Sequence, residues 1–236
     1  MRLDKYLADM NLGTRSEAKV LLKGKRVKVN GNIIKTGNHQ VDLQNDIVEL
    51  DGQVISYQKY FYYMLNKPAG VVSSTKDPLH KTVMELIRKE DFRDDLFMCG
   101  RLDKDTEGLL LIMNNGDLSY KLLAPQHHVD KKYYIECAED LKGEDIITLA
   151  HEVRLNDEET VRGGKLEIVG KRTAYLTINE GKFHQVKRMF HAINNEVLYL
   201  ERVTFGPLEL DPLLRHGEYR PLTEDEVGLL LDFIKK

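Results

Sequence analysis

The feature that most constrains the fold is a series of eight short apolar segments between residues 61 and 200. Turn residues separate these segments, and helical patterns occur between only some of them. The expected helices are 81–89, 117–123, 141–151, 184–193 and 224–235. Strands without regular crossover helices pair mostly antiparallel, so this order predicts an α+β domain. The expected strands are 61–65, 71–72, 96–99, 109–113, 133–137, 166–169, 174–178 and 197–200.

Composition narrows the class of protein. Of the 236 residues, 42% are hydrophobic, which is enough for a core. Two cysteines, Cys99 and Cys137, are too few for a disulfide framework, and no apolar run approaches the ~18 residues of a membrane span. We therefore expect a cytoplasmic protein that does not enter a membrane.

Charge is unevenly distributed along the chain. The net charge of −3 excludes a globally basic nucleic-acid binder. Residues 1–35, however, carry nine Lys and Arg against three Asp and Glu, a balance of +6, which leaves −9 for residues 36–236. A basic segment on an acidic body is typical of an RNA- or DNA-docking module beside a working domain. The alternative is a basic face that is only solvated.

The basic segment has its own pattern of elements. Apolar spacing predicts a short helix over 2–11, and the capping box of Thr14 and Glu17 begins a second one over 14–24. Asn30-Gly31 then predicts a hairpin turn. This arrangement presents a cluster of cations suited to backbone phosphates, namely Arg15, Lys19, Lys23, Lys25, Arg26 and Lys28.

We place a domain boundary near residue 58, giving an RNA-binding domain over 1–58 and a second domain over 59–236. The polar residues 56–59 that follow the apolar segment 47–50 mark this boundary. One continuous domain is the alternative.

The most informative segment is the loop between Gly100 and Gly108, which is dense in charge and lies between two apolar strands. Asp103 and Glu107 could form the acid/base pair of a glycosidase, or they could bind a divalent cation together with Asp105. A single aspartate could also serve as a nucleophile or base. The residue pattern alone leaves these readings open, along with a solvated connecting loop.

Cofactor sites are not indicated by the sequence. His127, His128, His184 and His191 lack the spacing of a zinc helix, and the phosphate-binding and dinucleotide-binding glycine motifs do not occur. We therefore expect neither a metal nor another cofactor.

Four segments together resemble a known family. Gly-Arg-Leu-Asp at 100–103, with Thr106 and Gly108-Leu109, is similar to the signature of the pseudouridine synthases. Residues 65–70, 180–190 and 217–223 agree with the branch that acts on ribosomal RNA, and their order and spacing resemble the small-subunit enzymes. Residues 2–7, 14–16 and 27–31 resemble the αL RNA-binding domain of a small-subunit ribosomal protein, with Arg2 in the first stretch.

The resemblance implies roles for particular residues. The family's catalytic aspartate falls on Asp103, its basic partner on Lys187, where many relatives have arginine, and its stacking tyrosine on Tyr133. By the same resemblance, Arg101 approaches the displaced nucleotide, and Lys67 shapes the floor near the site as a further substrate contact.

The expected protein is thus an α+β enzyme that isomerises a uridine of small-subunit ribosomal RNA without a cofactor, as a monomer. Its basic domain is expected to contact the RNA through the cluster above and Arg2, and its partner is ribosomal RNA or a partly assembled small ribosomal subunit. The alternatives are a large-subunit ribosomal RNA enzyme of the same subfamily and a non-catalytic ribosome-assembly protein.

Overall fold

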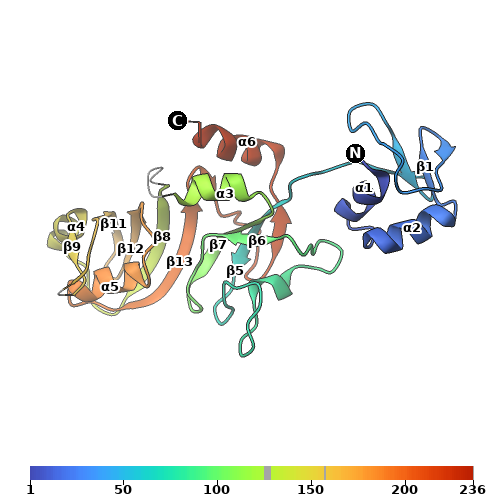
Figure 1. The fold of residues 1–236 in the computed structure, drawn as a ribbon. Helices are drawn as coiled ribbons and strands as arrows, with labels where there is room; N and C mark the ends of the chain where they lie inside the picture. Colours follow the sequence, from blue (N-terminus) through green and yellow to red (C-terminus); the bar gives the residue numbers. More distant parts are fainter. Residues whose placement is uncertain (125–128, 157, 236) are drawn as a thin grey trace. The chain divides into compact units, whose positions relative to one another are not determined.

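The computed structural model describes residues 1–124, 129–156 and 158–235. The chain divides into two compact units, Met1–Phe61 and Tyr62–Lys236, which we call the N-terminal and C-terminal units (Figure 1). The sequence places this division slightly earlier, at residue 58. Among the described residues, no helix combines the length and apolar character that crossing a bilayer requires.

The N-terminal unit packs two short helices on a small antiparallel sheet of order β2-β1-β3-β4. Its core contains Leu3 and Leu7 of the first helix, Leu22 of the second, and Val27 of the sheet. The predicted capping box of Thr14 and Glu17 is present. The elements are α1 (Leu3–Asp9), α2 (Arg15–Lys23), β1 (Val27–Val29), β2 (Asn32–Ile33), β3 (Val48–Leu50) and β4 (Gln53–Ile55).

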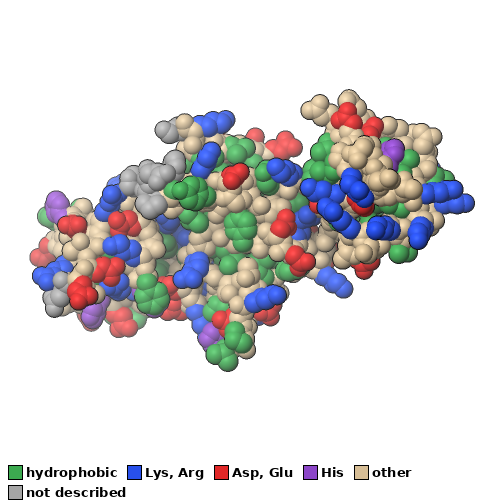
Figure 2. Space-filling view, viewed as in Figure 1, with side chains coloured by type: hydrophobic (Ala, Val, Ile, Leu, Met, Phe, Trp, Pro, Cys, Tyr) green, Lys and Arg blue, Asp and Glu red, His purple; other side chains and the backbone are tan. Residues whose placement is uncertain are grey.

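The predicted hairpin is confirmed in its backbone detail. Asn30 and Gly31 both have positive φ, 50° and 78°, which is the backbone that a two-residue turn of type I′ needs. Figure 2 shows lysine and arginine side chains gathered over this unit. The two helices and the hairpin of the sequence analysis therefore form as expected.

The C-terminal unit is built on one large sheet, with the path β11-β12-β8-β13-β7-β5-β15. Its elements are β5 (Tyr62–Lys67), the 3₁₀ turn η1 (Val83–Leu86), β6 (Phe97–Cys99), β7 (Glu107–Met113), α3 (Gly116–Leu123), β8 (Lys131–Cys137), α4 (Gly143–Ala150), β9 (Val153–Arg154), β10 (Thr160–Val161), β11 (Lys165–Gly170), β12 (Thr173–Ile178), α5 (Gln185–Ala192), β13 (Val197–Phe205), β14 (Leu208–Glu209), β15 (Tyr219–Pro221) and α6 (Glu224–Phe233).

The sheet confirms the predicted α+β class with mostly antiparallel pairing, because β13 and β7 form the one parallel pair among its described strands. Helices α3 and α6 cover the half around β7, where Leu118, Leu122 and Leu230 pack on Leu109 and Leu111 (Figure 1). Helix α4 lies beside β11, and α5 contacts β13.

Two expected elements differ from the structure. The helix predicted over 81–89 is only the turn η1, because the Arg88 backbone N–H donates to the Tyr219 hydroxyl at 3.0 Å instead of to a helical carbonyl. The strand predicted at 71–72 is reduced to an isolated bridge between Val72 and Thr82. In both places, contacts with distant residues replace the local pattern.

Glycine is required where β7 and β13 approach each other. Gly108 has φ +96°, and a Cβ there would lie 2.4 Å from the Arg202 carbonyl oxygen. Any side chain would therefore push these two strands apart. This close approach fixes the start of β7 next to β13, directly after the charged loop.

Candidate active site

The charged loop spans residues 100–106, between β6 and β7, and its backbone is held from one side. Ser73 Oγ donates to the Leu102 carbonyl at 2.8 Å and accepts from the Leu102 N–H at 3.1 Å. The Gly70 N–H donates to the Lys104 carbonyl at 2.8 Å. These bonds give the loop a defined path, so the side chain of Asp103 leaves the backbone in a fixed direction.

Lys67, which the sequence analysis places near the site as a substrate contact, is part of this support. Its side chain is completely buried, and its ammonium donates to the carbonyls of Pro68, Lys104 and Thr106 at 3.0, 3.2 and 2.7 Å. Burial lowers the pKa of Lys67 to about 8, although the nearby carboxylates oppose that shift. A lysine whose three donors are used by backbone oxygens has none left for a substrate.

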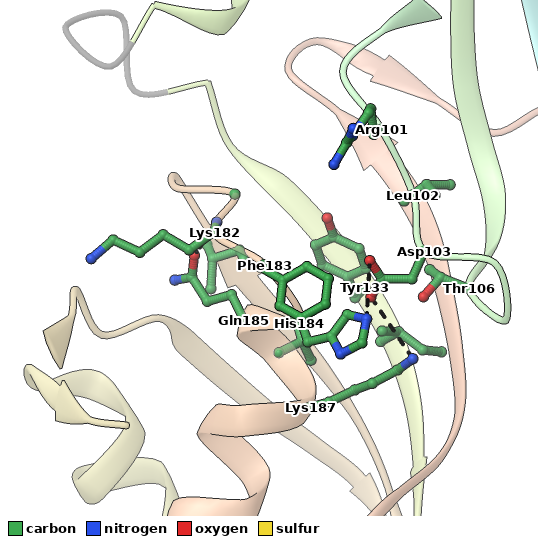
Figure 3. Close-up of a pocket in the computed structure, with 14 residues that line it drawn as sticks. Arg101, Leu102, Asp103, Thr106, Tyr133, Lys182, Phe183, His184, Gln185 and Lys187 are labelled. Carbon is green, nitrogen blue, oxygen red and sulfur yellow. Dashed lines mark hydrogen bonds and ion pairs between the residues drawn. The ribbon is translucent and has the colours of Figure 1, made fainter. Parts of the chain in front are cut away.

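Asp103 faces two nitrogen-bearing side chains from the segment around α5. Its Oδ2 lies 3.8 Å from Lys187 Nζ, and its Oδ1 lies 3.8 Å from His184 Nε2. Figure 3 shows the three side chains pointing toward one another. The Asp103 side chain is 28% exposed, so it is partly shielded and still open to a ligand. The structure thus brings together the predicted aspartate and its predicted basic partner.

Lys187 has a second and closer carboxylate, Asp105, which the sequence suggests only as a possible cation ligand. Its Nζ donates to Asp105 Oδ1 at 2.5 Å. Partial burial acts to raise the pKa of Asp105, but the hydrogen bond and charge of Lys187 outweigh it and lower this pKa below its usual value. The spacing of two residues from Asp103 is the signal that could have identified Asp105 as a competitor for the lysine.

The direction of Lys187 follows from the start of α5. His184 adopts the left-handed conformation, φ 48°, and the Lys182 N–H donates to Gln185 Oε1 at 2.9 Å, which fixes the entry into the helix. Met189 and Phe190 are buried on the inner face. The amphipathic helix therefore leaves Lys187 half-buried on the side toward the loop.

Tyr133 reaches the same place through the sheet. Arg202 of β13 is paired with Tyr133 of β8 on one side and with Gly108 of β7 on the other. Tyr133 therefore lies level with the start of β7, two strand spacings or roughly 10 Å away in the sheet. Its neighbour Tyr134 points to the opposite face, where it contacts Tyr175 and Tyr199.

A cavity of about 150 Å³ unites these side chains (Figure 3). Its lining includes Arg101, Asp103, Tyr133 and Lys187, four residues that the sequence analysis selected. Arg101 is exposed in the sequence-predicted loop, while Tyr133 is buried in the wall. The arrangement offers a carboxylate, a cation and an aromatic ring to one small ligand.

An aromatic pair at the same cavity is not among the predicted site residues. The rings of Phe183 and His184 stack with centroids 3.8 Å apart and an interplanar angle of 18°, and both residues line the cavity. Phe183 is 70% exposed, which is unusual for a phenylalanine without a ligand or partner to cover it. The available signal in the sequence was a phenylalanine directly before the helix predicted over 184–193.

The alternative chemistries of the loop are not supported by its geometry. Glu107 is absent from the lining of the cavity; its carboxylate accepts from the Ala69 N–H at 3.1 Å and lies 3.4 Å from His216 Nδ1. It therefore forms no pair with Asp103 across a common ligand. Within the described residues, no three His, Cys, Asp or Glu side chains cluster as metal ligands, and His127 and His128 lie outside these residues.

The predicted phosphate-binding cations of the N-terminal unit fall into two groups. Arg15, Lys19, Lys23 and Lys25 are exposed, and Lys28 is half-buried on β1. Arg26 is held by Asp51 at 2.5 Å, and Arg2 by Asp4 at 2.7 Å. These two guanidinium groups would have to share or leave an internal carboxylate to contact RNA.

Comparison with known proteins gives a consistent result over both units. Residues 1–48 match the family described as S4 domain, and residues 61–192 match RNA pseudouridylate synthase. A crystal structure of a pseudouridylate synthase is 36% identical, with a TM-score of 0.69, over 98% of this chain and 99% of that one.

The curated relatives agree. An uncharacterized RNA pseudouridine synthase of Bacillus subtilis is 43% identical over 98% of each chain. Ribosomal small subunit pseudouridine synthase A of Pseudomonas aeruginosa is 41% identical over 96% of this chain and 99% of the relative. The protein of the same name in Haemophilus influenzae is 38% identical over 98% of this chain and 100% of the relative.

The two family matches together define an enzyme that modifies bases within RNA. Within that class, the chain belongs to the RNA pseudouridylate synthase family. It is an isomerase, as the sequence analysis expects, and it binds RNA.

Proposed function

We propose that this enzyme converts a uridine of small-subunit ribosomal RNA to pseudouridine, with Asp103 as its catalytic carboxylate. The observation that carries the proposal is the convergence of Asp103, Lys187 and Tyr133 on one cavity of about 150 Å³. The choice of RNA is supported by the names of the relatives from Pseudomonas aeruginosa and Haemophilus influenzae, at 41% and 38% identity over nearly the whole chain. Such an enzyme would work in the cytoplasm, on free ribosomal RNA or on a partly assembled small subunit.

The reaction balances without a further reactant. The bond from ribose C1′ to uracil N1 breaks, a bond from C1′ to C5 forms, the proton on C5 leaves, and N1 gains a proton. No electrons are exchanged with a partner. One ionised carboxylate could assist either by attacking C1′ or by removing a proton from the ribose, and both routes need Asp103 charged.

Lys187 has the position to keep Asp103 ready for that step. A cation 3.8 Å from the carboxylate attracts it and limits its direction. Since Asp105 lies closer to the same ammonium, Lys187 would be shared between a positioning partner and the reacting carboxylate. The ammonium is a point charge, so it can serve both without the planar geometry that an arginine requires.

Tyr133 would hold the uracil ring through its face. Stacking permits a base to rotate in its own plane, whereas hydrogen bonds to one edge would oppose that rotation, and it contributes about 1–3 kcal/mol per base. A cavity of this kind accepts only a base that has left its helical stack, so the target nucleotide is flipped out or drawn from an unpaired loop. Arg101 at the rim would contact the displaced nucleotide.

The test compares Asp103→Asn with the matched variant Asp105→Asn. Tritium release from ribosomal RNA labelled at uracil C5 should vanish in Asp103→Asn, while RNA binding stays near the wild-type level. Asp105 is the other carboxylate partner of Lys187 and does not line the cavity. Asp105→Asn therefore makes the same chemical change outside the site and should keep measurable activity. Full activity of Asp103→Asn would refute the assignment.

The RNA target is tested separately. Transcripts of small-subunit and large-subunit ribosomal RNA are incubated with the wild-type enzyme, and pseudouridine is then mapped. A new pseudouridine in the small-subunit RNA is expected. Modification of the large-subunit RNA alone would move the enzyme to the other branch of its family.

A further inference from the structure

A second cavity adjoins the first one. It has a volume of about 500 Å³ and shares four lining residues with the first cavity, Arg101, Tyr133, Gly181 and Lys182. The volume of the second cavity falls within the ~300–1,000 Å³ that is typical of small-molecule sites, whereas the first cavity is smaller than that range. The first cavity therefore suits one flipped base, and the strand that carries the base has to continue past the shared residues.

The second cavity is rich in positive charge. Its lining contains five cationic residues and one acidic residue, Glu180, which pairs with Arg162 at 3.6 Å. Two of the cations, Lys131 and Arg202, come from neighbouring strands of the sheet. The Lys131 ammonium donates to the Val129 carbonyl at 2.8 Å rather than to a carboxylate. Burial, together with the charge of Arg202, lowers the pKa of Lys131 to about 8. Such a pair is stabilised when an anion binds beside it.

Arg202 has an unused donor at this place. The residue is only 1% exposed, and its Nε donates to the Leu109 carbonyl at 2.8 Å. Its Nη2 is buried and has no hydrogen-bond partner among the described residues. A buried guanidinium nitrogen without an acceptor costs free energy, so such a group points to a ligand that would supply one.

Part of the remaining wall is apolar, and Asn179 is a further polar residue of the lining. Leu122, Leu123 and Ala124 at the end of α3, together with Val129, line the cavity beside the cations. A nucleotide consists of a phosphate, a ribose and a base. The phosphate needs a cationic group and the base needs an apolar face. The lining supplies both.

We propose that the second cavity binds the nucleotide next to the target uridine on the same RNA strand. Its phosphate contacts Lys131 and Arg202, and its base lies against the end of α3. This inference rests on the proposed function, because it requires a uridine in the first cavity. It gives the enzyme a way to select the nucleotide that neighbours its target.

The test measures binding to a fluorescent RNA heptamer with one central uridine and three adenosines on each side. In two further heptamers, a neutral methylphosphonate replaces the linkage on the 5′ or the 3′ side of the uridine. The full-length enzyme is compared with Lys131→Met and with Lys132→Met as the matched control. Lys132 is the next residue of β8, and its ammonium contacts Glu167 at 2.9 Å and does not line the cavity.

One methylphosphonate should weaken binding to the wild-type enzyme about tenfold, the effect of a single charge-assisted hydrogen bond. Lys131→Met should lose about the same factor with the ordinary heptamer and should no longer distinguish the two linkages. Lys132→Met should behave as the wild type. If Lys131→Met does not fold, Lys131→Gln replaces it.

An undiminished methylphosphonate effect in the Lys131 variant, or no effect of either linkage in the wild type, overturns the inference. The proposed function has its own readout, pseudouridine formation in ribosomal RNA by the wild type. Conversion of uridine without the linkage effect refutes only the second cavity's role. The linkage effect without conversion refutes the proposed function and leaves a nucleotide site.

Discussion

Lys67 gives the enzyme a stability that depends on pH in a calculable way. The residue is fully buried, and its pKa is about 8 in the folded state against 10.5 ordinarily. Between these two values, the unfolded chain binds more protons than the folded one, so the free energy of unfolding rises with pH. Below pH 8 the lysine is protonated in both states, and its contribution is constant and at its least favourable.

The size of the effect follows from the two pKa values. For one group with these values, the free energy of unfolding rises by about 1.3 kcal/mol between pH 7 and pH 9. Lys131, with a pKa of about 8, adds a rise of the same sign. The pKa of Cys137 is raised to about 11 and that of Tyr63 to about 12, and groups raised in this way lower stability only above their ordinary values of 9 and 10.

Replacing Lys67 with methionine removes one of the two groups that make the free energy of unfolding rise with pH. Urea denaturation at pH 7, 8 and 9 should therefore show a rise that is smaller by about 1.3 kcal/mol in Lys67→Met than in the wild type. At pH 7 the variant should also be less stable by about 3 kcal/mol, because three carbonyl oxygens lose their donor. Lys104→Met, in an exposed residue of the same loop, is the control.

The rise in the free energy of unfolding from pH 7 to pH 9 is the decisive measurement, because it does not depend on how well methionine packs. An equal rise from pH 7 to pH 9 in Lys67→Met and the wild type would contradict a buried charged Lys67. The loop that carries Asp103 also loses its support in this variant, so kcat should fall more than the affinity for RNA.

Three further outcomes are expected. Tyr133→Phe should keep most of the wild-type affinity and rate, whereas Tyr133→Ala should lose about 1–3 kcal/mol of binding to a uridine-containing RNA; equal losses would assign the role to the hydroxyl. Gly108→Ala should lower the free energy of unfolding by about 3 kcal/mol, because strain at positive φ adds to the clash with β13. Its control, Gly70→Ala, has φ +82° and open space around it, so it should show only the strain, about 1 kcal/mol. Similar losses for the two variants in denaturant titrations would contradict the close approach of the strands. The double variant Arg15→Gln, Lys23→Gln should reduce the slope of log affinity against log salt by about 1.4 for single-stranded RNA, and an unchanged slope would remove these residues from the RNA contact.

Local patterns were sufficient for much of the fold. The capping box at Thr14 and the Asn30-Gly31 turn depend on neighbouring residues alone, so the first domain could be predicted in detail. The strand expected at 197–200 extends to Phe205 in the structure, as β13. The polar side chains of Glu201, Arg202 and Thr204 interrupt the apolar pattern there, and only pairing with β8 and β7 makes that segment a strand.

The sequence by itself determined the order of the elements, the segregation of charge and the charged loop with Asp103, because each depends on residues close together in the chain. Tertiary structure decided which side chains meet. Lys187 lies 82 residues from Asp105 and reaches it only because α5 packs beside the sheet. Lys67 and Arg202 are charged residues that any local pattern places on the surface, yet backbone carbonyls of distant strands and loops accept their hydrogen bonds in the interior. Burial of a charge depends on partners that only the assembled fold supplies.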